Sequence, residues 1–186
     1  SIDDYPIALI VTALAAMSFD KRIGRSLPDS DHLLITPHLA VAGEDEELDR
    51  IEKLFAEAGD VRHYRIARLL RSSCPALPQL KQLLEMNVRE VEKLDELSVE
   101  YSGGYWGYAV RGEFVIPPYY DLVFDFSEGL GLVRIADVWH FIDKRGEVVI
   151  TCGRGSGIKP FRNGVTRIRR EDGDMVIYRD GRIEKE

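Results

Sequence analysis

The sequence predicts an α+β protein, with an N-terminal helical bundle in residues 1–100 and a C-terminal antiparallel array of β-hairpin repeats in residues 101–186. Two observations support this fold class. Apolar residues recur at the three- and four-residue steps of helices in the first part, and alternate at every second position, as in strands, in the second. The phrase that begins at Trp106 also returns 33 residues later, at Trp139. A period of this size indicates small supersecondary units that stack on one another.

Capping and turn residues divide the N-terminal part into helices. Tyr5 to Ser18 is apolar almost all round, which predicts a helix at the centre of the bundle. Thr36 and Pro37 suit the N-cap and the first helical position of another helix. The clearest helix starts near Asp45, carries acids in its first turn and ends at Gly59. Two more helices, from Val61 to Ser72 and from about Ala76 to Leu97, and a junction at residues 100–104 complete this part.

Each repeat opens with a predicted β-hairpin. In the first repeat, Trp106, Tyr108 and Val110 alternate with other residues before a turn at Gly112. The corresponding turns of the second and third repeats are Arg145-Gly146 and Asp180-Gly181. Glycine accepts the positive φ of such turns without penalty, so these positions predict hairpins.

Two further features recur in the repeats. A Phe-x-x-Gly phrase at Phe126 and again at Phe161 is expected to begin an additional strand. The tryptophans are expected to pack between neighbouring hairpins, with Met175 at their place in the third copy. The alternative is that they form an exposed aromatic platform for a ligand.

Several of these phrases resemble the WG repeat family, also called KWG repeats. They are Trp106-Gly107, Ile116-Pro117-Pro118 with Tyr120-Asp121, Phe126-Ser127-Glu128-Gly129-Leu130, and Phe141-Ile142-Asp143-Lys144 with Gly146. The resemblance covers about residues 105–186 and implies a β-repeat array, mostly bacterial, that binds proteins and has no catalytic residues. Two departures, His140 for the glycine of the motif and Thr151 to Ser156 for the Pro-Pro-x-Tyr-Asp stretch, predict a remodelled loop in the second repeat.

Charge and hydropathy exclude some classes of function. Residues 1–100 hold 19 acids and 12 bases, whereas residues 101–186 hold 13 of each, so no part is basic enough to predict nucleic-acid binding. The longest apolar run, Ile7 to Met17, is too short to predict a membrane span. Two cysteines are too few for a disulfide framework, which favours a cytoplasmic protein. Export is not excluded, because an upstream segment could have been removed before Ser1.

Two groups of basic residues are candidates for contacts with a partner. Arg154, Lys159 and Arg162 lie in or after a glycine-rich loop and could face an anion, although a flexible inter-strand loop is the alternative. Arg62, Arg65, Arg68 and Arg71 step by three along one predicted helix. They predict either a surface for an acidic partner or ion pairs with the acidic helix that precedes them.

No catalytic, cofactor or metal site is predicted. The four histidines, His32, His38, His63 and His140, have no acid or cysteine partners at ligand spacing. Cys74 has no identifiable base nearby. The sequence therefore predicts a non-enzymatic protein that binds another protein. The alternative is an acidic inhibitor or immunity protein that neutralises a basic toxin or effector, and an enzyme would need a pocket whose residues cannot be recognised as a set.

Overall fold

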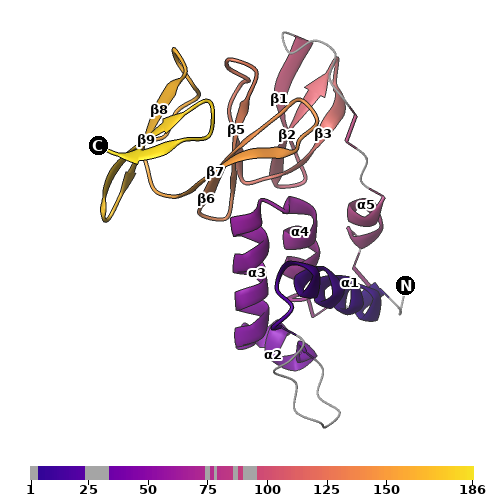
Figure 1. Ribbon diagram of the computed structural model, residues 1–186. Coiled ribbons are helices and arrows are strands. Elements are labelled where there is room, and N and C mark those ends of the chain that lie inside the picture. Colours follow the sequence, from indigo (N-terminus) through magenta and orange to yellow (C-terminus); the bar gives the residue numbers. More distant parts are fainter. Residues whose placement is uncertain (1–3, 24–33, 74–75, 78, 86–87, 90–95) are drawn as a thin grey trace. The chain divides into compact units, whose positions relative to one another are not determined.

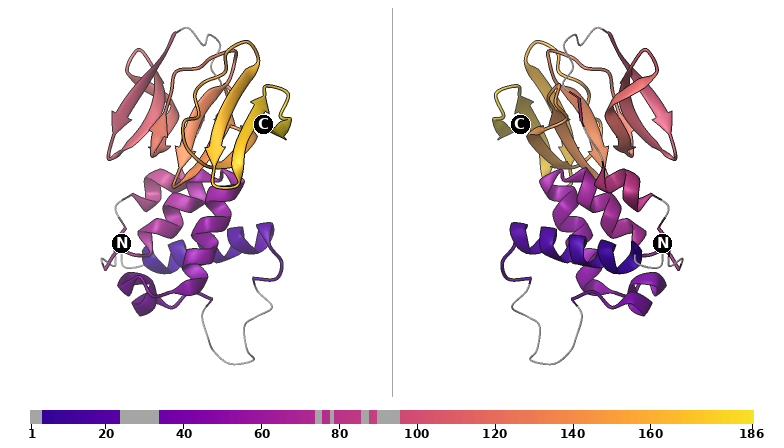
Figure 2. Two further views of the ribbon diagram at one scale, coloured as in Figure 1. Left: turned by 90° about the vertical axis from the view of Figure 1, so that its left-hand side faces the viewer. Right: turned by 90° about the vertical axis from the view of Figure 1, so that its right-hand side faces the viewer.

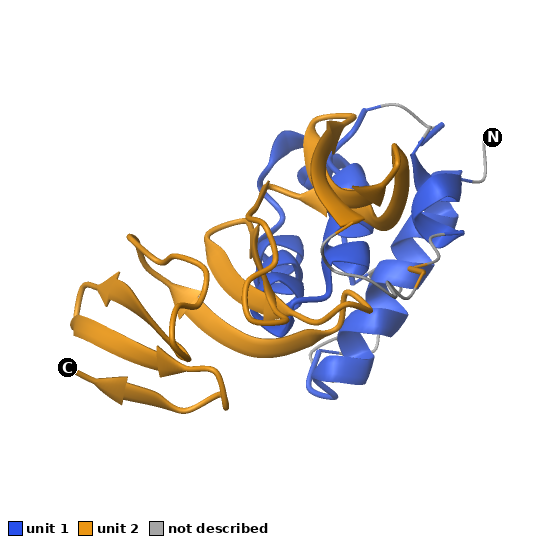
Figure 3. Ribbon diagram, turned by 90° about the horizontal axis from the view of Figure 1, so that it is seen from above, with its two compact units in different colours: residues 1–86 blue, residues 87–186 orange. Residues whose placement is uncertain are grey.

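The computed structural model describes residues 4–23, 34–73, 76–77, 79–85, 88–89 and 96–186. The chain divides into two units, residues 1–86 and residues 87–186 (Figure 3). Helices α1 to α5 lie in the first unit and strands β1 to β10 lie in the second (Figure 1). The predicted α+β fold, with helices followed by antiparallel hairpins, is confirmed.

The helices of the first unit differ in how they are capped, and Thr36 stands at the predicted N-cap position of its helix without a side-chain cap hydrogen bond. Their bounds are α1 Asp4–Phe19, α2 Pro37–Ala42, α3 Glu46–Ala58, α4 Val61–Leu69 and α5 Leu80–Leu84. The Asp45 carboxylate accepts a hydrogen bond from Leu48 N at 2.9 Å and so caps α3. The same carboxylate accepts from Thr36 N at 2.7 Å. Asp45 therefore fixes both the start of α3 and the residue that precedes α2.

Helix α1 packs across α3 and α4, which lie side by side (Figure 2). It buries only a stripe of small side chains, Ala8, Thr12 and Ala16, against them. Its larger residues Ile7, Ile10, Leu14 and Phe19 are exposed. The core comes instead from α3 and α4, whose fully buried side chains are Leu48, Ile51, Phe55, Ile66 and Ala67. The predicted central position of α1 is therefore wrong, since one face of this helix remains outside the core.

The prediction of one helix from Ala76 to Leu97 is also wrong. Only Leu80–Leu84 is helical in the described part of this segment, and Leu97 already begins a strand. Arg89 is not helical because its backbone N–H donates to Val115 O, in a strand, at 2.9 Å. Tertiary pairing here overrides the helical pattern of leucines.

The second unit consists of three antiparallel sheets. Their strands are β1 Leu97–Ser102, β2 Tyr105–Val110, β3 Glu113–Tyr120, β4 Leu122–Val123, β5 Gly131–Ile135, β6 Val138–Ile142, β7 Val148–Arg154, β8 Val165–Arg170, β9 Gly173–Tyr178 and β10 Ile183–Lys185. The sheet orders are β1-β2-β3, β4-β5-β6-β7 and β10-β9-β8. Each repeat is thus a three-stranded meander, and β4 adds a short strand to the second.

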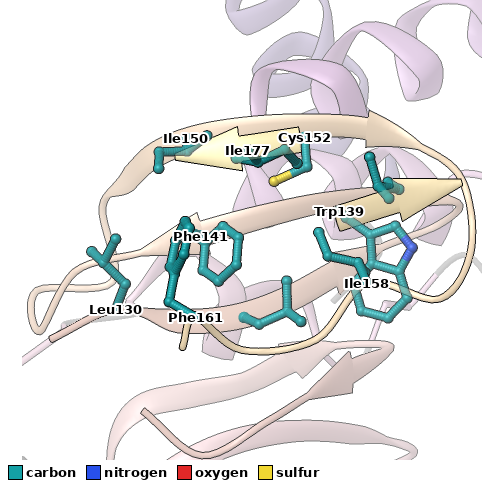
Figure 4. Close-up of a cluster of buried hydrophobic side chains, with 10 residues drawn as sticks. Leu130, Trp139, Phe141, Ile150, Cys152, Ile158, Phe161 and Ile177 are labelled. Atoms are coloured by element: carbon teal, nitrogen blue, oxygen red, sulfur yellow. The ribbon is translucent and has the colours of Figure 1, made fainter. Parts of the chain in front are cut away.

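A hydrophobic cluster joins the second and third sheets (Figure 4). It includes Trp139 and Phe141 of β6, Cys152 of β7, Phe161 of the connection and Ile177 of β9. The Phe141 and Phe161 rings stack with their centroids 4.2 Å apart. Both sheets and the connection between them contribute side chains to this cluster, as expected for a repeat array.

Candidate functional site

The repeats are joined by the same contact in two places. Tyr108 of β2 packs edge-on against Phe126 with ring centroids 4.9 Å apart, as Phe141 of β6 packs on Phe161. The Tyr108 hydroxyl also donates to Phe124 O at 2.7 Å. Burial is the main cause that raises the pKa of Tyr108 well above its ordinary value. The phenylalanine of each Phe-x-x-Gly phrase therefore covers the central strand of the preceding repeat.

The rest of this phrase is a tight turn that precedes the next strand. Glu128 and Gly129 have φ of 53° and 87°, and Asn163 and Gly164 have φ of 53° and 75°, as a two-residue turn of type I′ requires. The two turns also bind each other. Ser127 Oγ donates to Phe161 O at 2.8 Å, and Gly164 N donates to Glu128 Oε2 at 2.9 Å.

The glycine of Trp106-Gly107 is required by a close approach of backbone. Tyr108 pairs with Ile116 and Trp106 pairs with Tyr120, so residues 117–119 of β3 lie opposite Gly107 alone. A Cβ atom at Gly107 would lie 2.5 Å from Ile116 O. The Pro-Pro-x-Tyr-Asp stretch therefore bulges over the glycine and leaves no room for a side chain.

The second repeat changes both parts of this arrangement together. His140 replaces the glycine and pairs directly with Thr151, while Trp139 pairs with Gly153, so only Cys152 is extra in β7. His140 Nδ1 lies 3.2 Å from Thr151 Oγ1. The bulge of β7, with one extra residue, is smaller than the bulge of β3 and leaves room for a side chain at His140. The two departures from the motif are therefore one structural change. Sequence reasoning identified each departure but not their connection, which depends on the strand register.

The two tryptophans have different surroundings. Trp139 is 8% exposed, and its Nε1–H donates to Gly155 O at 3.1 Å. Trp106 is only half-buried and packs against Tyr101 of β1, which is 59% exposed, with ring centroids 5.0 Å apart. The packing role predicted for the tryptophans therefore describes Trp139, whereas Trp106 and Tyr101 form an aromatic pair that is open to solvent. We call these two residues the aromatic pair.

The family comparison agrees with this repeat geometry. Residues 111–139 match the family model of the WG containing repeat. This stretch runs from the turn after β2 to the tryptophan of β6, and so contains the Pro-Pro-x-Tyr-Asp bulge and the Phe-x-x-Gly turn. The resemblance to WG repeats is therefore confirmed for these residues. No curated protein and no solved structure matches the chain.

The third repeat differs in which residues are buried. In each repeat a two-residue turn joins the first strand to the second, and the first residue of the second strand closes this turn. The next residue is Trp106 in the first repeat, Trp139 in the second and Asp174 in the third. Asp174 therefore occupies the tryptophan position, and Met175 is one residue later. The buried Ile177 belongs to the same alternating set as Met175. The expectation that Met175 replaces the tryptophan is therefore wrong by one residue, and the opposite set of side chains faces the cluster.

The glycine-rich loop of the array lies between β7 and β8, as the inter-strand interpretation expects, and hydrogen bonds hold its middle. Ser156 exchanges two backbone hydrogen bonds with Arg169, both of 2.9 Å. Arg154 forms an ion pair with Asp137. Lys159 and Arg162 are exposed, and Lys159 O accepts from Thr166 Oγ1 at 2.8 Å. The loop thus connects the second sheet to the third, and the charge of Arg154 is partly compensated within the array.

The arginine row of α4 is mostly engaged inside the helical unit. Arg71 Nε lies 2.7 Å from Glu52 Oε1, and Arg68 lies 3.5 Å from the same carboxylate. Arg65 is buried, with 6% exposed, and Arg62 is half-buried. Pairing with the acidic helix is therefore confirmed for Arg68 and Arg71. The row does not form one continuous exposed surface.

The remaining candidate residues show little sign of chemistry. Burial raises the pKa of the Cys152 thiol to about 12, so this cysteine is held as the neutral thiol. His63 Nδ1 lies 2.7 Å from Asp60 Oδ2, at the start of α4. His32 and Cys74 lie outside the described residues. Within the described ranges, no group of three or more His, Cys, Asp or Glu side chains could hold a metal ion. No described helix is both long and apolar enough to cross a membrane.

Proposed function

We propose that the chain is a non-enzymatic module that binds another protein through the first WG repeat. The observation that carries this proposal is the aromatic pair, Tyr101 and Trp106, which lies open to solvent on an ordered sheet. Tyrosine and tryptophan contribute large contact areas at a low cost in side-chain entropy, and they are enriched among the residues that dominate binding energy. Their fixed position on two paired strands reduces the ordering cost of binding further.

The strand that carries Tyr101 also suits a protein ligand. Glu100 and Ser98 alternate with Tyr101 on β1, and the Ser98 hydroxyl donates to Glu100 Oε1 at 3.0 Å. Strand β1 therefore carries Tyr101 of the aromatic pair on one face and polar side chains on the other. The buried neutral thiol of Cys152, by contrast, is unsuited to nucleophilic catalysis.

The alternative, an acidic inhibitor, has less support from the contacts. Two acids of α3, Asp49 and Glu52, already bind Arg71, and Glu52 also binds Arg68. Carboxylates that are compensated within the chain attract a basic partner less strongly. The aromatic pair is therefore the better candidate for the contact surface.

The test is quantitative capture of partners on the immobilised full chain, followed by affinity measurement with the purified partner. Tyr101→Ala and Trp106→Ala are compared with Val149→Ala, a control that removes another exposed apolar side chain, 52% exposed against 59% for Tyr101, from β7. We expect the partner to bind the unaltered chain and the control equally, and the Tyr101→Ala chain at least about tenfold more weakly. Absence of any partner, or equal affinity for all variants, would refute the proposal.

A further inference from the structure

The first strand of each repeat presents an outer edge with the same geometry. Each of these strands is followed by a two-residue turn, flanked by Ser102 and Tyr105, by Ile135 and Val138, or by Arg170 and Gly173. The two residues that flank such a turn exchange backbone hydrogen bonds with each other. The residue that precedes the first of them in the strand therefore directs its N–H and C=O groups away from the hairpin. These outward residues are Tyr101 in β1, Arg134 in β5 and Arg169 in β8.

In the second and third repeats, the end of the preceding repeat pairs with this edge. Strand β4 pairs antiparallel with β5, and Asp121 N donates to Arg134 O at 3.0 Å while Phe124 N donates to Leu132 O at 2.9 Å. Ser156, after β7, makes the equivalent bridge to Arg169 of β8. Each repeat thus supplies a short extended segment to the one that follows.

The first repeat has no preceding repeat, and β1 is the edge of its sheet among the strands that the structure describes. Its outward residues by position are Tyr101 and Val99, which correspond to Arg134 and Leu132 of β5. Strand β1 runs for six residues in uninterrupted register with β2, without proline, lysine or a bulge. Such an edge is well suited to pair with another strand.

Other sheet edges of the unit carry features that prevent strand addition. Strand β3 contains Pro117 and Pro118, and its Val115 O already accepts from Arg89 N. Strand β4 has two residues, and β10 has three and ends in Lys185. The remaining edges are β7, whose register with β6 shifts at two places, and β8, which Ser156 already bridges at Arg169. Strand β1 has none of these features, and it carries Tyr101 of the aromatic pair.

We infer that an extended segment of the partner protein pairs antiparallel with β1, as β4 pairs with β5. This inference rests on the proposed function and names the form of its ligand. In the β4–β5 register, Leu122 lies opposite Arg134 and Val123 lies opposite Val133. The residues of β1 at these two positions are Tyr101 and Glu100.

The side chains of β1 define the chemistry of the segment. A residue opposite Tyr101 lies on the face that carries the aromatic pair, so an apolar side chain is favoured there. A residue opposite Glu100 lies on the other face, beside a carboxylate that is half-buried, so lysine or arginine is favoured. The partner segment is therefore an extended peptide in which apolar and basic residues alternate.

The inference is tested on the full chain with a synthetic peptide that copies residues 119–125 and has lysine in place of Val123. A second peptide with glutamate at that position is the control. Binding is followed by NMR through the backbone amides of Val99 and Tyr101. We expect these amides to shift on addition of the lysine peptide, with an affinity at least about tenfold higher than for the glutamate peptide.

A proline at Val99 separates edge pairing from other modes of binding. The Val99 N–H points outward, so Val99→Pro removes a donor from the open edge and leaves the bonds to β2 in place. Val99→Ala, which keeps this donor, is the matched control. We expect Val99→Pro to abolish binding of the lysine peptide and Val99→Ala to retain it, with the amide spectrum of β2 unchanged in both.

Several results would overturn the inference. One is no shift at Val99 and Tyr101 at millimolar peptide, and another is binding that survives Val99→Pro. If the chain dimerises by itself and Val99→Pro abolishes this dimerisation, the segment that pairs with β1 belongs to a second copy of the chain instead of a partner protein. If a captured partner binds Val99→Pro as tightly as the unaltered chain but is lost with Tyr101→Ala, the proposed function stands and strand pairing is wrong.

Discussion

The replacement of Gly107 by alanine tests whether the glycine opposite the bulge of β3 is required for packing. The three nearest neighbours of an added Cβ atom are Ile116 O at 2.5 Å, Pro117 C at 2.7 Å and Pro118 N at 2.7 Å. All three are backbone atoms, so no side chain can rotate away to make space. The two prolines also restrict the movement of β3, because their φ angles are fixed.

The expected destabilisation follows from this geometry. Overpacking a close-packed site typically costs 1–3 kcal/mol, and the contacts at Gly107 are shorter than real Cβ contacts allow. We therefore expect Gly107→Ala to lower the free energy of unfolding by about 3 kcal/mol. For a unit of this size, about 4–8 °C of Tm is lost per kcal/mol, so Tm falls by roughly 12–24 °C.

Urea unfolding monitored by tryptophan fluorescence is a suitable assay, because both tryptophans of the chain, Trp106 and Trp139, lie in the repeats. Gly103→Ala is the matched control. Gly103 has a φ of +60° and nothing within 4 Å of an added Cβ, so only conformational strain of about 1 kcal/mol is expected. If Gly107→Ala unfolds at the same urea concentration as Gly103→Ala, the argument from close approach is wrong.

Three further predictions concern the buried groups. Trp139→Ala is expected to cost about 3–5 kcal/mol in urea unfolding, and Trp106→Ala about half as much, because Trp106 is only half-buried. The raised pKa of Cys152 means that the unfolded chain loses this proton at a lower pH than the folded chain does. The contribution of Cys152 to stability is therefore constant below the ordinary thiol pKa of 9.0 and falls by up to about 1.4 kcal/mol per pH unit above it, until the folded pKa of about 12 is reached. Burial also raises the pKa of Tyr108, so Cys152→Ala should reduce the slope between pH 9 and 10 without abolishing it. Arg71→Ala is expected to cost about 2 kcal/mol in thermal unfolding, because it withdraws the closest partner of the nearly buried Glu52, and equal stability would mean that Arg68 suffices.

Much of the fold is encoded locally and could be predicted. Asp45 and Gly59 are typical capping residues, and they lie at the two ends of α3 as the sequence indicates. Gly112 and Gly146 lie in turns within the repeats for the expected reason, with φ of 83° and 73°. In these places a single residue type is sufficient, because its backbone preference decides the structure.

The errors arise where pairing between distant residues decides the structure. Strand β1 follows a segment whose leucines have a helical spacing, yet its alternation of Leu97, Val99 and Tyr101 before Gly103-Gly104 is a hairpin signal that was available in the sequence. The link between His140 and the changed bulge was not available, because it depends on which residue of β7 lies opposite β6.

The direction of the array explains why the open edge lies at its start. The first and second repeats each receive a phenylalanine from the segment that follows, as Tyr108 receives Phe126. The second and third repeats each receive a pairing segment from the repeat that precedes, as β5 receives β4. Among the described strands, the first repeat therefore has its central strand covered but has no segment paired with the outer edge of β1. A binding site of this kind needs no dedicated insertion, since it is the position at which a repeating chain has no earlier copy. Adding such a segment ahead of β1 by fusion should accordingly compete with the partner for the edge, and a fusion that leaves partner affinity unchanged would show that the partner binds elsewhere.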